Sequence, residues 1–381
     1  MKEDNVAVLT LINSINYGGT LQAIALNQVL KKLGKNVIYI KYGKDWKILL
    51  NPFSVYKRLL FYYDENNLIN RLKAFLKALL SMKDSFSYTS KKKRYKKYKE
   101  YINNYIKLSQ EFLNINDLKN YDFDCGVFIV GSDQVWNADI KFQSCLDPVY
   151  LLEFVPAGTK KIAYAASAGG KKSEEEIEYL YEYLRDFTAI SVREDSLALS
   201  LNHFGLNCVS VLDPTLLLNA YDWNKYEESF QMKYKFILVY SLEYDEHIEQ
   251  QINLLLKKGL KILDVSPEKF YKKTKCEYKN LNTPGEFLYA IHNSSGILTN
   301  SFHGTVFSII YRRHFITTTR KGQESRTYDL LSKLNLLDHL DVDIENTSFM
   351  MSKEINYNAV EKILEDQQSK SLEFLKRNIQ L

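Results

Sequence analysis

The first forty residues alternate between apolar runs and one amphipathic segment. Residues 6–12 form an apolar run that predicts a buried strand, and a polar turn at 16–19 follows it. Residues 21–33 have the spacing of an amphipathic helix, and residues 37–41 predict the next strand. A strand, a glycine-containing turn, a helix and a strand in this order are typical of the start of a doubly wound parallel sheet.

The same alternation returns in two further series along the chain. It predicts an α/β protein of two Rossmann-like doubly wound lobes in tandem, residues 1–215 and 216–381, the second ending in a terminal helix. This is a GT-B-like outline, in which ligands bind in the cleft between the lobes at the carboxyl ends of the strands. The expected strands are residues 125–130, 161–166, 189–192, 236–240, 261–265, 296–299 and 315–318; the expected helices are 173–187, 246–258, 285–292, 303–311 and 328–334.

A basic segment at about 41–110 interrupts the first series. It holds 17 Lys and Arg but only five Asp and Glu, a net charge of +12 in a chain whose total is +5. Apolar and aromatic residues are interleaved with the cations, and a lysine cluster follows at 91–99. One interpretation is an interface helix on an anionic membrane surface. The other is a helical insertion in the first lobe that packs an apolar face on the lobe and leaves a solvated basic face.

Composition narrows the class of protein. Apolar residues make up 45% of the chain and charged residues 25%, which is typical of a packed globular protein. The four cysteines lack zinc-ligand or disulfide-framework spacing, so we expect no metal. No run approaches the roughly 18–20 apolar residues of a membrane span, and the first apolar run is too short for a signal peptide. We therefore expect a cytoplasmic protein, with a peripheral position at the inner face of the membrane if the basic segment binds lipid.

Polar residues that directly follow the expected strands are the first candidates for a site. Gly18 and Gly19 lie between the first strand and helix, where backbone N–H groups can hold an anion. Taken alone, this segment is better explained as a tight strand-to-helix turn. Arg193 follows strand 189–192 and could grip a carboxylate or phosphate with two parallel hydrogen bonds. The alternative for Arg193 is a surface position, paired with Glu194 or Asp195.

The segment after strand 125–130 is rich in polar side chains. Ser132, Asp133 and Gln134 should project from the carboxyl end of that strand into the crevice. Trp136 would then offer an aromatic face to a sugar ring. The alternative is an Asp that caps the following helix and a Trp that belongs to the core.

His303 has a setting that the other five histidines lack. It follows an apolar strand and a short polar turn, and it begins an apolar helix. A helix N-terminus attracts anions and disfavours an imidazolium, so His303 could act as a neutral base beside a phosphate-binding turn. A structural role for this histidine is the alternative.

Six short segments together resemble the polysaccharide pyruvyl transferase family. They occur in the family's order between about residues 5 and 335. The segments are NYGGTLQ at 16–22, GSDQVW at 131–136, AAS at 165–167, SVRE at 191–194, LDPT at 212–215 and NSFHGT at 300–305.

The resemblance implies a GT-B-like fold and a reaction. A pyruvyl group would move from phosphoenolpyruvate, the donor substrate, to two hydroxyls of a sugar in a bacterial surface-glycan precursor, forming a ketal without a cofactor or metal. The acceptor would be a sugar or a lipid-linked oligosaccharide. By similarity, His303 is the acid/base residue and Arg193 acts with it on the donor. Donor-binding roles fall to Ser301, Gly304, Thr305, Arg326, Gly18 and Gly19, and acceptor-binding roles to Ser132, Asp133, Gln134 and Trp136.

Two other functions share parts of this description. A GT-B glycosyltransferase that uses a nucleotide sugar would have the same fold and cleft, and a fold alone does not determine function. A basic binding protein for membrane or nucleic acid would use the basic segment and leave the cleft idle. Glycine-arginine and stacking-platform patterns are rare in the chain, so we expect no nucleic-acid partner.

Overall fold

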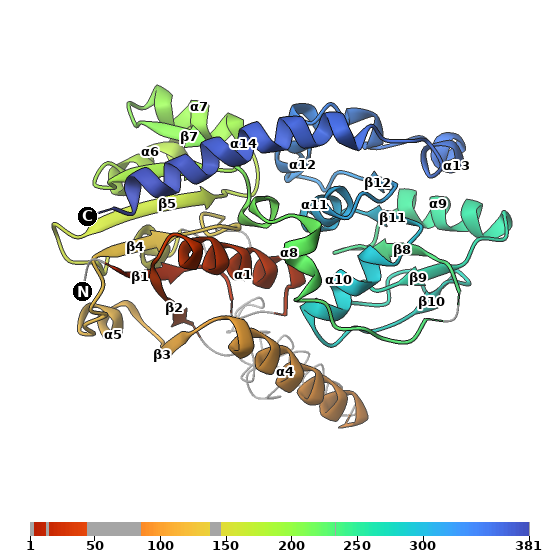
Figure 1. Cartoon of the computed structure of the whole chain (residues 1–381), viewed down its shortest axis with the longest axis horizontal. Helices are drawn as coiled ribbons and strands as arrows, with labels where there is room; N and C mark the ends of the chain where they lie inside the picture. The colour runs from red at the N-terminus through yellow and green to blue at the C-terminus, as the bar shows by residue number, and fades with distance from the viewer. Residues whose placement is uncertain (1–3, 13–14, 44–84, 138–145, 233, 381) are drawn as a thin grey trace, which may run out of the picture.

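Two parallel sheets, each with helices on its faces, form the protein (Figure 1). The computed structural model describes residues 4–12, 15–43, 85–137, 146–232 and 234–380, without the side chains of residues 85–91. The GT-B-like outline of two Rossmann-like lobes is confirmed, since the two sheets occupy successive parts of the chain.

The first sheet has seven strands in the order β3-β2-β1-β4-β5-β6-β7, and all neighbours are parallel. The order reverses between β1 and β4, whose carboxyl ends therefore flank a crevice. The short β7 and the polar β3 carry no clear alternation and were not predicted. The strands are β1 (Asn5–Leu9), β2 (Asn36–Tyr42), β3 (Leu108–Phe112), β4 (Val127–Val130), β5 (Lys160–Ala166), β6 (Ala189–Val192) and β7 (Cys208–Ser210).

The second sheet has five parallel strands in the order β10-β9-β8-β11-β12. Its order reverses between β8 and β11, so both sheets present a switch point at the carboxyl ends of their central strands. The strands are β8 (Ile237–Tyr240), β9 (Ile262–Asp264), β10 (Glu277–Tyr278), β11 (Gly296–Thr299) and β12 (Phe315–Thr317).

Helices connect the strands and cover the sheets. Two of them begin at candidate segments: the Asn16 side chain caps α1 by accepting from the amide of Gly19, and Ser301 caps α11 in the same way. The helices are α1 (Tyr17–Lys32), α4 (Ser85–Tyr105), α5 (Ile115–Lys119), α6 (Glu174–Leu184), α7 (Asp195–His203), α8 (Ala220–Asn224), α9 (Glu246–Lys257), α10 (Pro284–His292), α11 (Phe302–Ile310), α12 (Glu324–Lys333), α13 (Thr347–Met350) and α14 (Tyr357–Asn378), with short 3₁₀ helices η4 (Pro148–Leu151), η5 (Pro214–Leu217), η6 (Leu337–His339) and η7 (Ile344–Asn346).

A continuous apolar core joins the two lobes. The ring of Tyr17 on α1 stacks on Phe287 of α10 with centroids 5.1 Å apart, and its hydroxyl donates to the carbonyl of Leu281 in the second lobe. Trp223 and Phe307 are fully buried in the same cluster. The carboxyl ends of the two sheets are therefore held close together.

The C-terminal helix α14 runs from the second lobe onto the first (Figure 1). Its Ser371 hydroxyl accepts from the amide of Leu212 at 3.0 Å, and the ring of Phe374 lies 6.2 Å from that of Tyr164 on β5. The predicted division at residue 215 places this helix with the second lobe, but its C-terminal half packs on the first.

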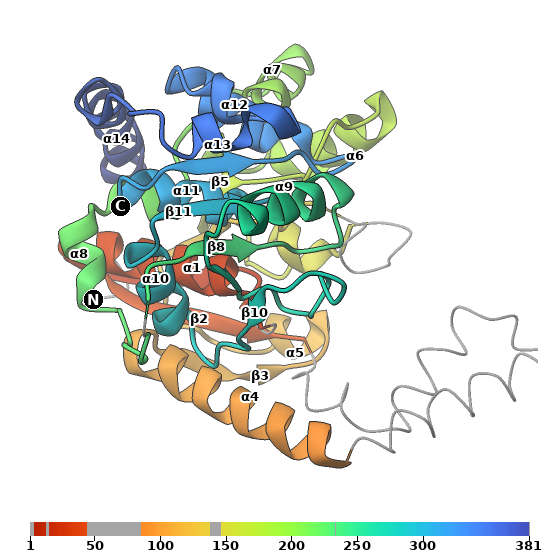
Figure 2. The ribbon, with the colours of Figure 1, turned by 90° about the vertical axis from the view of Figure 1, so that its right-hand side faces the viewer.

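Helix α4, the described part of the basic insertion, lies along the edge of the molecule (Figure 2). Its inner face is buried against both lobes, since the hydroxyl of Tyr98 donates to the carbonyl of Asn16 at 2.7 Å and that of Tyr101 donates to the carbonyl of Tyr226 at 2.7 Å. Helix α4 thus packs one face on the protein, as the interpretation of the basic segment as a helical insertion predicts, and its contacts extend to both lobes. Residues 44–84 of the insertion lie outside the described residues. No helix in the described ranges has the length and apolar character needed to cross a bilayer.

Candidate active site between the lobes

The sequence-predicted residues converge where the carboxyl ends of the strands meet. Gly18 follows β1, Asp133 follows β4, Arg193 follows β6, and His303 follows β11 of the other sheet. All four are buried, with Arg193 and His303 each 6% exposed. The structure therefore brings residues that are up to 285 positions apart into one cluster.

Asp213 lies at the centre of this cluster, and both of its carboxylate oxygens accept hydrogen bonds. Its Oδ2 atom accepts from Nη1 of Arg193 at 2.7 Å and from the hydroxyl of Ser132 at 3.0 Å, and it lies 3.7 Å from Nε2 of His303. Its Oδ1 atom accepts from the amide and the hydroxyl of Thr215 at 3.0 and 2.6 Å. Burial alone would raise the pKa of the Asp213 carboxyl, but His303, Arg193 and Thr215 lower it well below its usual value. Asp213 is therefore a buried carboxylate that holds an arginine of one lobe beside the histidine of the other.

Arg193 is not the surface residue of the alternative interpretation. Besides its ion pair with Asp213, its Nη2 atom lies 3.6 Å from Oδ1 of Asp133. Its guanidinium stands 4.8 Å from the centre of the Phe302 ring. Arg193 thus has a fixed position, with one face against an aromatic ring and two carboxylates at its edge.

Arg326 approaches the same ring from the second lobe. Its guanidinium lies 5.9 Å from the centre of the Phe302 ring. When the Gln134 amide is oriented with its oxygen toward Arg326, both terminal nitrogens of Arg326 donate to that oxygen at 2.6 and 2.9 Å. Gln323 accepts from Arg326 and, at 3.2 Å, from Arg320. Burial, together with repulsion from Arg193, lowers the pKa of Arg326 to about 10. Gln134 and Arg326, predicted separately, therefore form a direct bridge between the lobes.

Several buried nitrogens of the cluster have no hydrogen-bond partner among the described residues. They are Nε and Nη2 of Arg193, Nε of Arg326 and Nε2 of His303. Buried polar groups are nearly always hydrogen-bonded, and exceptions at a cleft are typical of places where a ligand binds. Guanidinium groups from two lobes suit a ligand with two anionic groups.

The turn at Gly18 fits closely against His303. A Cβ atom at position 18 would stand 2.1 Å from Nδ1 of the imidazole, whereas one at Gly19 would stand 3.0 Å from Oδ2 of Asp133. The absence of a side chain at Gly18 therefore gives the imidazole its position. Position 18 therefore requires glycine because of the close contact with His303, and not only because the chain turns there.

The hydroxyl groups of the turn at 301–305 hydrogen-bond within the protein. Ser301 caps α11 by accepting from the amide of Gly304 at 3.3 Å, and Thr305 donates to the carbonyl of Ser301 and to the hydroxyl of Thr317. Thr305 is fully buried, and its amide also donates to the carbonyl of Ser301, at 3.0 Å, so both of its donors are engaged within the protein. The first amides of α11, which have no intrahelical acceptors, are the groups of this turn that remain suited to an anion.

Two of the expected acceptor-binding residues point elsewhere. Trp136 is 1% exposed within the core, and its indole nitrogen donates to the carbonyl of Tyr150 at 3.1 Å. Its ring face is therefore not available to a sugar, and the core alternative is correct. Ser132 is fully buried, and its hydroxyl hydrogen-bonds with Asp213 and the carbonyl of Ala165. Asp133 and Gln134 remain at the junction of the lobes.

Sequence reasoning did not assign roles to Asp213 and Glu194. Asp213 follows an apolar stretch that ends at Leu212, the same signal that singled out Asp133. Glu194 was considered only as a surface partner of Arg193, yet it is 2% exposed. Buried acids beside a buried arginine become visible only when the strands are assembled.

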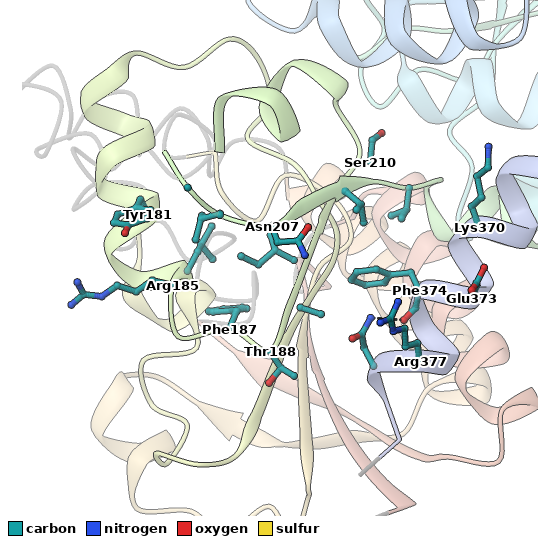
Figure 3. Close-up of a pocket in the computed structure, with 18 residues that line it drawn as sticks. Tyr181, Arg185, Phe187, Thr188, Asn207, Ser210, Lys370, Glu373, Phe374 and Arg377 are labelled. Carbon is teal, nitrogen blue, oxygen red and sulfur yellow. Dashed lines mark hydrogen bonds between the residues drawn. The ribbon is translucent and has the colours of Figure 1, made fainter. Parts of the chain in front are cut away.

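A separate pocket of about 770 Å³ lies at the β7 edge of the first sheet (Figure 3). Phe187 borders it on one side, and Phe374 and Arg377 of α14 border it on the other. It contains none of the sequence-predicted site residues. The backbone of Cys208 on β7 is already bonded to the Asn202 side chain through both its N–H and its C=O, which blocks strand addition at this edge.

Within the described ranges, no group of three or more His, Cys, Asp or Glu side chains is arranged to hold a metal ion.

The fold and the cluster define a two-lobed α/β protein with a GT-B-like architecture and a site between its lobes. The chain belongs to the polysaccharide pyruvyl transferase family, whose model matches residues 16–321. No curated protein sequence matches the chain.

Solved structures of two other proteins have a similar two-lobed fold. The UDP-N-acetylglucosamine 2-epimerase of Rickettsia bellii is similar at a TM-score of 0.51 and 9% identity, over 98% of this chain and 96% of that one. The UDP-GlcNAc 2-epimerase of Methanocaldococcus jannaschii has a TM-score of 0.50 and 10% identity, over 95% of this chain and 91% of that one. At such identities the likeness concerns the fold alone.

Proposed function

We propose that the protein transfers the pyruvyl group of phosphoenolpyruvate to two hydroxyls of one sugar, forming a cyclic ketal on a precursor of a bacterial surface glycan. The observation that carries this proposal is the pair of buried guanidinium groups, one from each lobe, with unpartnered nitrogens beside His303. Family membership supports the transferase class and a sugar acceptor.

The donor has two anionic groups on one enol carbon, a carboxylate and a phosphate. The guanidinium groups of Arg193 and Arg326 lie 4.8 and 5.9 Å from the centre of the Phe302 ring, and each would bind one of these anionic groups. The amides that begin α11 and the Gly18 turn would complete the anion site. Because the two arginines belong to different lobes, binding of the donor would favour the closed arrangement.

His303 would remove the proton from the attacking sugar hydroxyl. Its Nε2 atom has no hydrogen-bond partner in the described part of the chain, and it lies 3.7 Å from Oδ2 of Asp213, whose negative charge would stabilise the imidazolium that forms. A positioned base of this kind contributes roughly 10²- to 10⁴-fold to a rate. Asp133 and Gln134 border the same space and would bind the acceptor sugar, either free or linked to a lipid. No step of this reaction needs a metal or other cofactor.

The competing function is transfer of a sugar from a nucleotide sugar. Thermal-shift measurements with phosphoenolpyruvate and a panel of nucleotide sugars separate the two. We expect stabilisation by phosphoenolpyruvate, and release of phosphate when sugar acceptors are added. Stabilisation by a nucleotide sugar alone would favour the glycosyltransferase.

The role of His303 has its own test. His303→Ala should lower turnover by about 10²-fold or more and leave donor binding largely intact, because a base acts in the transition state. His203→Ala, on the solvent-exposed end of α7, is the matched control. Near-normal turnover of a folded His303→Ala protein would remove this histidine from the mechanism.

We further propose that the outer face of α4 binds an anionic membrane surface. Lys92, Lys93, Lys96 and Lys97 are all exposed on this face, and the ion pair of Lys96 with Glu100 at 3.7 Å leaves most of the positive charge unpaired within the described ranges. The same helix reaches the site through Tyr98, so a membrane-bound α4 would hold the cleft near a lipid-linked acceptor. Each cation near such a surface contributes about 1 kcal/mol.

A further inference from the structure

Glu194 is a buried acid at the edge of the donor site that the reaction described above does not use. It directly follows Arg193 and is 2% exposed. Its Oε1 atom accepts a hydrogen bond from the hydroxyl of Ser167, and its Oε2 atom is buried without a partner among the described residues. One oxygen of this carboxyl is thus held in place, and the other is available to a ligand.

The other buried acids of the cluster are engaged differently. Asp213 and Asp133 lie 2.7 and 3.6 Å from nitrogens of Arg193, and each is an ion-pair partner of that guanidinium. Glu194 forms no ion pair within 4 Å in the part of the chain that is described, although Arg193 and Arg326 are the cations nearest to it. Glu194 is therefore the carboxyl of the cluster with the environment of a neutral acid.

Electrostatics agree with this geometry. Burial raises the pKa of the Glu194 carboxyl above its usual value, and Arg193, the Ser167 hydroxyl and Arg326 offset that effect only in part. Two carboxyl groups in one site with pKa values moved in opposite directions, Asp213 down and Glu194 up, are the arrangement by which enzymes separate an ionised group from a proton donor.

The proposed reaction requires such a donor. Attack of a sugar oxygen on the enol carbon is favourable only if the neighbouring methylene carbon receives a proton and becomes a methyl group. His303 cannot supply that proton in the same step, since it is taking one from the attacking hydroxyl. A second acid/base group must stand near the donor.

We propose that Glu194 is the general acid that protonates the methylene carbon of the donor. As the sugar oxygen bonds to the enol carbon, the π electrons of the double bond take the proton of Glu194, and His303 takes the hydroxyl proton. The carbon–oxygen bond to phosphate then breaks, and the departing phosphate receives the proton held by His303. The second hydroxyl bonds to the same carbon and gives its proton to the Glu194 carboxylate. Both residues return to their starting states, and one ketal and one phosphate are formed.

This inference rests on the proposed function, and Glu194→Gln tests it. Glutamine keeps an oxygen that can accept from Ser167, but it has no acidic proton. We expect turnover to fall about 10²-fold or more while phosphoenolpyruvate still stabilises the variant. In the wild type, turnover should decline on the alkaline side as Glu194 ionises, and the residual turnover of the variant should lack that decline. Glu182→Gln, an exposed acid on α6, should behave as wild type.

The outcomes are distinct. Turnover of Glu194→Gln within about threefold of wild type, with the alkaline decline intact, would overturn the inference. So would loss of donor stabilisation with unchanged turnover at saturating donor, because Glu194 would then only position the arginines. If glutamine is not tolerated in the fold, Glu194→Asp must retain the alkaline decline at a reduced turnover, and its absence counts against the inference. A wild-type protein that releases no phosphate from phosphoenolpyruvate contradicts the proposed function instead.

Discussion

The Nε2 atom of His303 lies 3.7 Å from Oδ2 of Asp213, and the two residues belong to different lobes. The same Oδ2 atom accepts from Arg193 at 2.7 Å. One carboxylate oxygen therefore fixes the expected base and the expected donor-binding arginine together. The arrangement depends on contacts between the two lobes, so the position of one lobe relative to the other determines the geometry of the site.

Asp213→Asn should weaken both the fold and the site. The change leaves the buried Arg193 without its main counter-charge, which costs about 3–5 kcal/mol when one partner of a buried ion pair is lost. We expect a lower melting temperature, weaker stabilisation by phosphoenolpyruvate and reduced turnover. Asp186→Asn, an exposed acid of the same lobe, is the control. Unchanged donor binding and melting temperature would show that Asp213 does not hold Arg193.

Arg193→Lys should weaken donor binding while preserving the positive charge. A lysine cannot stack a planar group on Phe302 or present two parallel donors to a carboxylate or phosphate. Isothermal titration with phosphoenolpyruvate measures the effect, which we expect to be about tenfold or more in Kd. If the lysine variant binds phosphoenolpyruvate with the same affinity as wild type, Arg193 does not bind it through two parallel hydrogen bonds.

Gly18→Ala should disturb catalysis more than Gly19→Ala. The new Cβ at position 18 would stand 2.1 Å from the imidazole of His303, so the ring must move, whereas at position 19 it would approach the carboxylate of Asp133 to 3.0 Å. We expect a large loss of turnover for the first variant and a smaller one for the second, as measured by phosphate release. The reverse order would show that the His303 ring is not held by the turn.

The strand and helix pattern was readable from the sequence wherever the chain is apolar and regular. Strands β6 and β11 were predicted with the limits they have in the structure, and most of the other predicted strands to within two residues, because a buried parallel strand is an apolar run with clear ends. Strand β3 was missed because its sequence, LSQEF, lies at the edge and is largely polar. The contact of the C-terminal half of α14 with the first lobe was not predicted, because periodicity gives no information on where an amphipathic face packs.

The residues of the candidate site were likewise predicted only in part. Arg193 and His303 were found because polar residues after apolar strands collect at one edge of a parallel sheet. Arg326, which lies within α12, was found only through the family resemblance. The rule does not say which way a side chain turns, so Trp136 was assigned to the cleft although it packs in the core. Asp213 contacts Arg193 in one lobe and His303 in the other, and no short segment of the sequence indicates that these residues meet.

Glu194 should make the stability of the protein depend on pH. Its folded-state pKa is raised, so the native carboxyl keeps its proton to a higher pH than the unfolded one. This contribution to the free energy of unfolding is fully present below the unfolded pKa, about 4.3, and is lost as pH rises through the folded value. The melting temperature of Glu194→Gln, measured relative to wild type over a range of pH that starts at about 4.3, should therefore increase as the pH is raised. A difference that stays constant or decreases over that range would contradict the raised pKa.

Replacing the exposed lysines of α4 should abolish binding to anionic membranes without affecting the site. Lys92, Lys93, Lys96 and Lys97 form the outer face of a helix whose inner face is fixed by buried tyrosines, so Gln at all four positions removes charge but no packing contact. We expect co-sedimentation with phosphatidylglycerol-containing liposomes that weakens as salt is raised, and its loss in the variant, with turnover on a soluble acceptor retained. A protein with the same charge change at the exposed residues Lys257, Lys258, Lys272 and Lys273 should still bind. Equal binding to neutral and anionic liposomes, or equal loss in both variants, would exclude a specific membrane face on α4.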